Sequence, residues 1–282
     1  MTTARIACVQ TTSTPDLSAT VDAACDSLRA AHARGADFAL LPENAPMTAG
    51  EKDIRAQAAD EETHPALAAF RDVAAECRMW LLIGSMAVQA PKGKLANRSV
   101  LIDDAGAVVA RYDKIHMFDV DLAGGESYRE SNTFQSGADA VLATTPWGPL
   151  GMTICYDLRF PGLYRALAQA GARMMSVPSA FTRPTGKAHW HVLLRARAIE
   201  TGCFVFAPAQ CGTHYGRRKT YGHSLIVDPW GEILADGGDQ PGVVMADIDL
   251  AGTDEARAMV SSLEHDRPYT APSASALRPA AE

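Results

Sequence analysis

The sequence has no pair of cysteines spaced as C-x-x-C, although it contains six cysteines spread over 282 residues. Scattered thiols of this kind are typical of a reducing compartment rather than of a disulfide framework. No apolar run approaches the roughly 20 residues that span a bilayer. The first residues, MTTARIACVQ, have no hydrophobic region of a signal peptide. We therefore expect a cytoplasmic protein with no membrane partner.

The sequence also has fewer basic than acidic residues. Lys and Arg number 26 against 33 Asp and Glu, which leaves a net charge of −7. A general nucleic-acid binder needs a basic face, so we expect no nucleic-acid partner. A short basic run, Arg217-Arg218-Lys219, follows Gly216. We interpret it as a solvated loop rather than a phosphate site.

The sequence also lacks the common nucleotide-binding motifs and the nucleophile elbow of serine hydrolases. No G-x-G-x-x-G or P-loop pattern follows a predicted strand, which argues against a nucleotide-binding module. The nucleophile elbow G-x-S-x-G is absent too, since Ser224 stands in YGHSL without the second glycine.

What is present is an alternation of short apolar strands and helical segments. Strands are predicted at 6–9, 37–41, 80–83, 98–102, 108–112, 150–154, 174–177 and 203–207, and helices at 18–33, 65–77, 162–170 and 187–200. The strands at 98–102 and 108–112 are joined by a turn and predict a hairpin. Residues 225–231 and 243–248 are predicted to pair with each other, and 121–139 to form a loop-rich region. Since no linker interrupts this alternation, we expect one α/β domain with mixed sheets and outer helices.

Three residues whose side chains could act in catalysis follow or adjoin predicted strands. Glu43 comes directly after FALLP, Cys155 directly after GMTI, and Lys114 just beyond the strand at 108–112. Catalytic groups in α/β sheets gather where strands end, so these side chains are expected to converge. A neutral thiol needs a base or a nearby cation to attack. A glutamate whose pKa is raised by burial can accept the proton, and a lysine can hold the oxyanion of an acyl-transfer intermediate.

The segments LLPEN, RYDKIHMFD and MTICYDLRFPGLYR resemble, in this order, the three catalytic blocks of the nitrilase, or carbon–nitrogen hydrolase, superfamily. The resemblance extends over residues 4–248. It implies a single domain with a four-layer α-β-β-α sandwich and places Glu43, Lys114 and Cys155 in a catalytic triad. It also implies pairing through outer helices, as a homodimer or a larger homo-oligomer. We expect this domain at 1–265, followed at 266–282 by an arm or a disordered tail rich in Ala, Ser and Pro.

The same resemblance implies a mechanism that needs neither a cofactor nor a metal. Glu43 takes the proton of Cys155, and the thiolate attacks an amide carbonyl to form a thioester. Lys114 and the backbone N–H of Tyr156 hold the oxyanion. Glu130, in GGESYRESNTF, matches the position of a second glutamate, and Glu126 is its local rival.

Further segments narrow the resemblance within the superfamily. SYRESNTFQSG, PSAFTRPTGKAHWHVLLRARAIETG, APAQCG and YGHSLIVDPWG are similar to the branch that contains deaminated glutathione amidases. The ω-amidases, which hydrolyse 2-oxoglutaramate, are close to that branch and remain the alternative. Either activity implies an enzyme that cleaves a small 2-oxo-acid amide. A catalytically silent protein of the same fold, used as a binding scaffold, is the alternative from another class.

Both candidate substrates carry a carboxylate on the acyl half, and the forked guanidinium of arginine suits such a group. Arg159, four residues after Cys155, is predicted to bind it, unless it forms a salt bridge with Asp157 instead. Deaminated glutathione additionally has a dipeptide leaving group. Side chains of the loop FTRPTGKAHW are predicted to contact that group, namely Thr182, Arg183 and Lys187.

The histidines offer two further candidate sites, a metal site and a protease dyad with Cys155. His189 and His191 form an H-x-H pattern, but positions i and i+2 of a helix point apart, so we do not expect them to share a metal. A cysteine–histidine protease could use His116 or His223, but no protease signature surrounds Cys155.

Overall fold

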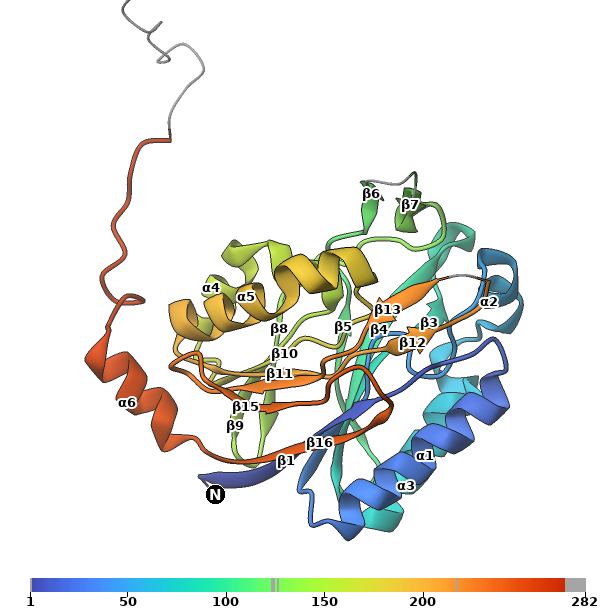
Figure 1. Ribbon diagram of the computed structural model, residues 1–282, viewed down its shortest axis with the longest axis horizontal. Helices are drawn as coiled ribbons and strands as arrows, with labels where there is room; N and C mark the ends of the chain where they lie inside the picture. The colour runs from blue at the N-terminus through green and yellow to red at the C-terminus, as the bar shows by residue number, and fades with distance from the viewer. Residues whose placement is uncertain (1, 123–124, 126, 217, 272–282) are drawn as a thin grey trace, which may run out of the picture.

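Two six-stranded sheets form the centre of the molecule (Figure 1). The computed structural model describes residues 2–122, 125, 127–216 and 218–271. In spatial order, the first sheet contains β16 (Gly242–Asp249), β1 (Thr3–Gln10), β2 (Phe38–Leu40), β3 (Trp80–Gln89), β4 (Leu95–Ile102) and β5 (Val108–Asp113). The second contains β15 (Ile233–Asp236), β14 (Leu225–Val227), β11 (Phe204–Ala207), β10 (Met174–Ser176), β9 (Gly148–Met152) and β8 (Val141–Thr145).

Helices cover the outer face of each sheet. The helices are α1 (Leu17–Ala33), α2 (Glu51–Gln57), α3 (Pro65–Cys77), α4 (Pro161–Gln169), α5 (Arg183–Thr201) and α6 (Ala251–Met259). Figure 1 shows α1 and α3 together on one side of the molecule, with α4 and α5 on the other. No helix among the described residues is both long enough and apolar enough to cross a membrane.

The four layers follow from the period-two alternation of the strands. In β1, Ile6 and Cys8 belong to a buried cluster that includes both sheets and the inner faces of α4 and α5. Ala7 and Val9 point the other way, into a second cluster shared with α1 and α3. A strand with apolar residues on both faces is buried on both sides. The layers are therefore helix, sheet, sheet and helix, as the family resemblance implies.

Local signals in the sequence account for the helix ends. The side chain of Asp16 caps α1 by accepting a hydrogen bond of 3.0 Å from the backbone N–H of Ala19. Helix α5 starts with Pro184 in its first turn and ends at Gly202, whose φ of +59° suits the left-handed conformation of a C-terminal cap.

Three predicted elements differ from the structure. The segments 225–231 and 243–248 do not pair, because residues 233–236 form β15, which takes the edge of β14 and leaves β16 to pair with β1. The strand before Cys155 ends at Met152 rather than at residue 154. The region expected to be loops contains a small hairpin, β6 (Asp119–Asp121) with β7 (Ser127–Arg129).

The remaining short elements flank the site described below. They are β12 (Cys211–Thr213) and β13 (Lys219–Tyr221), which pair with each other, and the 3₁₀ turns η1 (Glu61–Thr63), η2 (Pro91–Gly93), η3 (Glu130–Asn132) and η4 (Cys155–Arg159). Asp266 lies against α4, where it accepts hydrogen bonds from Arg165 and Gln169. Of the predicted tail at 266–282, residues 272–282 lie outside the described part of the chain.

Candidate active site

The segment after β2 holds Glu43 against β3. The N–H of Leu41 donates to the carbonyl of Leu82 at 2.9 Å, and the N–H of Asn44 donates to Ser85 Oγ at 2.9 Å. At Gly84 the two backbones approach so closely that a Cβ would lie 2.0 Å from the carbonyl oxygen of Leu41. Only glycine fits there, and this contact fixes the entry of the chain to Glu43.

Cys155 opens the 3₁₀ turn η4 just beyond β9. It is 7% exposed and has a φ of +49°, a left-handed conformation that costs a non-glycine residue on the order of 1–3 kcal/mol. Its N–H donates to the carbonyl of Pro178 at 2.9 Å. A fully buried carboxylate, that of Asp157, accepts the N–H of Ile154 at 2.8 Å. These bonds hold the sharp turn that presents the Cys155 side chain.

Asp157 also binds the segment that contains Lys114. Its carboxylate accepts the hydroxyl of Tyr112 at 2.7 Å and the N–H of His116 at 3.1 Å, and it contacts the His116 ring at 2.7 Å. Because Tyr112 and His116 flank Lys114, Asp157 fixes the position of Lys114 relative to the turn at Cys155. The salt bridge between Asp157 and Arg159, which the sequence left open, is not among the contacts of the described residues.

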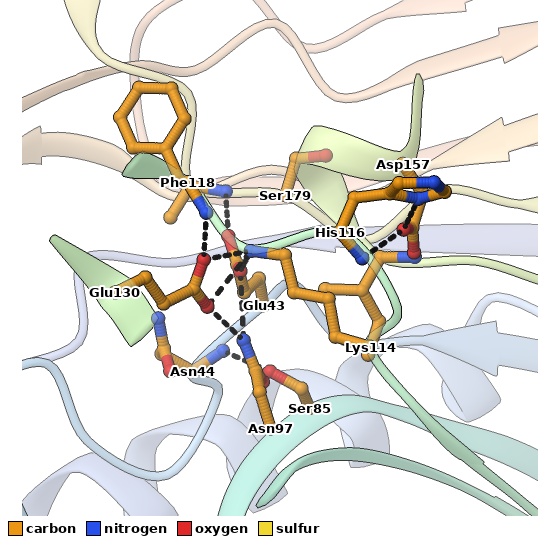
Figure 2. A network of polar contacts seen from close by, with 12 residues as sticks. Glu43, Asn44, Ser85, Asn97, Lys114, His116, Phe118, Glu130, Asp157 and Ser179 are labelled. Carbon is orange, nitrogen blue, oxygen red and sulfur yellow. Dashed lines mark hydrogen bonds and ion pairs between the residues drawn. The ribbon is translucent and has the colours of Figure 1, made fainter. Parts of the chain in front are cut away.

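Lys114 lies between two carboxylates, as Figure 2 shows. Its Nζ donates to Glu43 Oε1 at 2.9 Å and to the two carboxylate oxygens of Glu130 at 2.8 and 3.0 Å. Asn97, on β4, donates to both glutamates at 3.1 Å. The second oxygen of Glu43 accepts the N–H of Ala180 at 2.9 Å. The side chain of Lys114 is 1% exposed and that of Glu43 5%, so this network is shielded from water.

Neighbouring charges determine the protonation of these groups. Burial alone would raise the pKa of Glu43, but the charge of Lys114 and hydrogen bonds with Cys155 and Lys114 lower it below its ordinary 4.5. The expected rise in the pKa of Glu43 is therefore wrong, because Lys114 offsets the burial. Burial would lower the pKa of Lys114, but Glu130 and Glu43 raise it. For the Cys155 thiol, burial and Glu43 raise the pKa well above 9.0.

At neutral pH the resting site therefore contains a neutral thiol, two carboxylates and an ammonium. The thiol of Cys155 and the carboxylate of Glu43 form a hydrogen bond with each other, so Glu43 is placed to accept the thiol proton.

A pocket of about 210 Å³ opens above Cys155. Of the residues predicted for the site, it is lined by Glu43, Lys114, Glu130, Cys155, Tyr156 and Thr182. Glu126, the rival of Glu130, lies outside the described residues. The other side chains of the lining include Phe118, Tyr128, Phe134, Phe181 and Tyr215. Because polar and charged side chains, Arg129 and Arg218 among them, line the pocket beside these aromatic rings, a small molecule with both apolar and polar groups suits it.

Three predicted contact residues are not among the described residues that line the pocket. Arg183 and Lys187 are exposed on the first turns of α5. The Arg159 guanidinium stacks 5.9 Å from the ring of Tyr156 and 5.5 Å from that of Phe181. Arg159 therefore contacts two side chains that line the pocket, Tyr156 and Phe181, but does not itself belong to the described lining.

Asn97 and Arg218 are among the polar residues of the site that sequence reasoning missed. Asn97 lies inside a buried strand, LANRSVLI, and a polar residue in such a strand was an available signal. Arg218 lines the pocket, although its basic run was interpreted as a solvated loop. Its neighbour Arg217 lies outside the described residues. Arg218 is half-buried, and its Nε is shielded from solvent, so its side chain does not lie in a solvated loop.

The predicted divergence of His189 and His191 agrees with their contacts. The ring of His189 lies 3.3 and 3.4 Å from the guanidinium nitrogens of Arg159, whereas His191 Nε2 lies 3.2 Å from Asp236. In the described part of the chain, His191, His223 and Asp236 form a group close enough to hold a metal ion. Hydrogen bonds from both rings to Asp236 already account for this arrangement.

Comparison with known proteins places this geometry in context. The family model described as "Carbon-nitrogen hydrolase" matches residues 5–258. A deaminated glutathione amidase of Yersinia enterocolitica is 42% identical over 236 residues, which cover 83% of this chain and 82% of that protein.

Two solved structures are also similar. The NitFhit protein of C. elegans has a TM-score of 0.88 and 34% identity, and the alignment covers 95% of this chain and 66% of that one. A mutant of the amidase from Nesterenkonia sp. AN1 has a TM-score of 0.79 and 27% identity, with 94% of each chain covered. That structure shows covalent addition of the acetamide moiety of fluoroacetamide at the active site cysteine.

Proposed function

Because the chain belongs to the carbon–nitrogen hydrolase family and is an amidase, we propose that it hydrolyses a small 2-oxo-acid amide through a thioester on Cys155. Deaminated glutathione is the proposed substrate, and 2-oxoglutarate and cysteinylglycine are the products. The observation that carries this proposal is the buried contact of Glu43, Lys114 and Glu130 beside Cys155 at the base of a small pocket. The relatives named deaminated glutathione amidase support the choice of substrate.

In the proposed acylation step, Glu43 accepts the thiol proton while the sulfur attacks the amide carbon. The carbon–nitrogen bond then breaks, and Glu43 returns the proton to the departing amine. Water enters, gives a proton to Glu43 and attacks the thioester carbon. The carbon–sulfur bond breaks, the acid leaves, and the thiol regains its proton from Glu43. Each proton is returned, so the net reaction consumes one water.

The oxyanion of both tetrahedral intermediates is proposed to bind Lys114 and the backbone N–H of Tyr156. Donors already in place before the reaction stabilise developing charge without reorganisation, and one such donor is worth about 10²–10³ in rate. Glu130 and Asn97 act as positioning residues, because they hold Lys114 and Glu43 where they are.

The choice of substrate is tested by comparing kcat/KM for deaminated glutathione and for 2-oxoglutaramate with the same purified enzyme. We expect a clear preference for deaminated glutathione. If 2-oxoglutaramate is hydrolysed far faster, the protein is an ω-amidase. If neither is hydrolysed and no acyl adduct forms, the scaffold alternative replaces both.

We also propose a homo-oligomer, a homodimer or larger, that associates through α5. Val192 and Ile199 on this helix are 68% and 55% exposed, and exposed large apolar side chains favour an interface. A cytoplasmic location is part of the same proposal, because a nucleophilic thiol must stay reduced.

Replacing Lys114 with arginine is expected to lower kcat by about 10²–10³. A planar guanidinium cannot occupy the place of a compact ammonium that bonds two carboxylates in a buried site. Steady-state kinetics measure the effect, and a thermal melt shows whether the variant is folded. The same change at the exposed Lys92 is the control and should leave kcat unaltered. A folded Lys114→Arg enzyme with near wild-type kcat would show that Lys114 is not an oxyanion donor.

A further inference from the structure

Arg218, one of the basic residues of the pocket, has a hydrogen-bond donor that no described residue uses. Arg218 lines the same pocket as Cys155, and its Nε is buried with no hydrogen-bond partner among the described residues. Its Nη2 makes a long contact of 3.5 Å with the carbonyl of Ala180, and its guanidinium also interacts with Tyr215. The guanidinium carbon lies 5.8 Å from the centre of the Tyr128 ring. A buried polar N–H without a partner is costly, so this side chain is prepared for an acceptor that a ligand would supply.

The other basic side chains that line the pocket each form a salt bridge with a carboxylate. Lys114 is held by Glu43 and Glu130. Arg129 forms two hydrogen bonds with Asp121, at 2.8 and 2.9 Å, and its side chain is 46% exposed. Among the described lining residues, Arg218 is therefore the cation that forms no salt bridge with a carboxylate, and it can bind an anion.

The charge of the catalytic groups makes such a cation necessary for an anionic substrate. The carboxylates of Glu43 and Glu130 with the ammonium of Lys114 sum to one negative charge. A carboxylate brought into this shielded site would be repelled, because charges interact strongly where water is excluded. Arg218 neutralises that excess, and its charge is among the causes that lower the pKa of Glu43.

We propose, on the basis of the amidase function above, that Arg218 binds the carboxylate of the acyl half of the substrate. Its forked guanidinium can make two parallel bonds with such a group. Ala180 joins this subsite to the reacting centre, because its carbonyl contacts Arg218 and its N–H bonds Glu43. The acyl half stays attached to Cys155 until water releases it, so its anchor belongs at the shielded end of the pocket. The leaving amine departs towards solvent.

The test compares Arg218→Met with the wild type on three amides. These are deaminated glutathione, 2-oxoglutaramate and pentanamide, which has the same five-carbon length but no carboxylate. We expect kcat/KM to fall about 10²–10³-fold for both anionic substrates, because two charge-assisted hydrogen bonds are lost. The value for pentanamide should change by less than about threefold. Arg218→Lys, which keeps the charge but not the fork, should give an intermediate loss for the anionic pair.

Binding of 2-oxoglutarate, the product of the acyl half, provides a readout that does not depend on turnover. Calorimetry should show its Kd raised about 10²-fold or more in Arg218→Met. Arg29→Met, at a surface position of α1, is the matched control and should change neither kinetics nor binding. Thermal melts of all variants establish that they are folded.

The outcomes separate the subsite from the function on which it rests. If wild-type enzyme hydrolyses none of the three amides, the proposed function fails. If it is active and Arg218→Met weakens all three amides equally, or leaves the Kd of 2-oxoglutarate unchanged, the carboxylate subsite is wrong. A loss confined to deaminated glutathione would place Arg218 at the leaving group and would also overturn the proposal.

Discussion

A Cys155→Ala variant is expected to lose amide hydrolysis almost completely, with kcat lowered by about 10⁴–10⁶. The thiol is the atom that forms the covalent intermediate, and removal of a nucleophile leaves only binding and oxyanion stabilisation. The substitution removes a single sulfur atom from a turn that is held by backbone bonds and Asp157. We therefore expect the variant to fold with a melting temperature close to that of the wild type.

Rapid acid quench followed by peptide mass spectrometry tests the same residue directly. In the wild type an acyl group should be found on the peptide that contains Cys155. Cys25→Ala, in the buried cluster between the first sheet and its helices, is the matched control and should retain full activity. An adduct on Cys203 or Cys211, or an active Cys155→Ala enzyme, would contradict the proposed nucleophile.

The second large effect is expected for Glu43→Gln, which should slow acylation and deacylation by about 10²–10⁴ each. One carboxylate serves as base in both steps, and an amide cannot accept the proton. Pre-steady-state kinetics separate the two steps. Glu76→Gln on the surface of α3 is the control. If only one step slowed, a different group would have to act in the other.

The pH profile supplies an independent check on Glu43. Its pKa lies below the ordinary 4.5, so Glu43 stays ionised at pH values where a free glutamate is already protonated. Activity that depends on the ionised form should therefore be constant through neutral pH and fall only below about pH 4.5. Circular dichroism at each pH excludes acid unfolding as the cause. An acid limb centred near pH 6 or 7 would point to another titrating group.

The sequence predicted much of the fold because its signals are local. The caps of α1 and α5, the apolar alternation of the strands and the turn between β4 and β5 all depend on a few neighbouring residues. The pairing of 225–231 with 243–248 was predicted from their proximity in the chain. Their actual partners are set by competition for sheet edges, and β1, the partner of β16, lies more than 200 residues away.

The same distinction applies to the site. Glu43 and Cys155 could be singled out because each follows a short strand, where functional side chains of α/β proteins collect. Arg218 could not, since a basic run after glycine looks the same in a solvated loop and beside a pocket. Its position depends on the fold, which brings the Arg218 guanidinium to the carbonyl of Ala180. For Arg159 the opposite holds. It was predicted to bind substrate because it follows Cys155 closely in the sequence, but it is not among the described residues that line the pocket.

The pairing of β1 with β16 has a consequence for synthesis of the chain. β1 is synthesised more than 200 residues before β16, so its outer edge is covered only when Gly242–Asp249 emerge from the ribosome. Until then, one edge of the first sheet is unpaired, and such an edge can recruit strands of other chains. Contacts of this long range also slow folding. A nascent chain that stalls before residue 242 therefore exposes an unpaired strand edge that can bind strands of other chains.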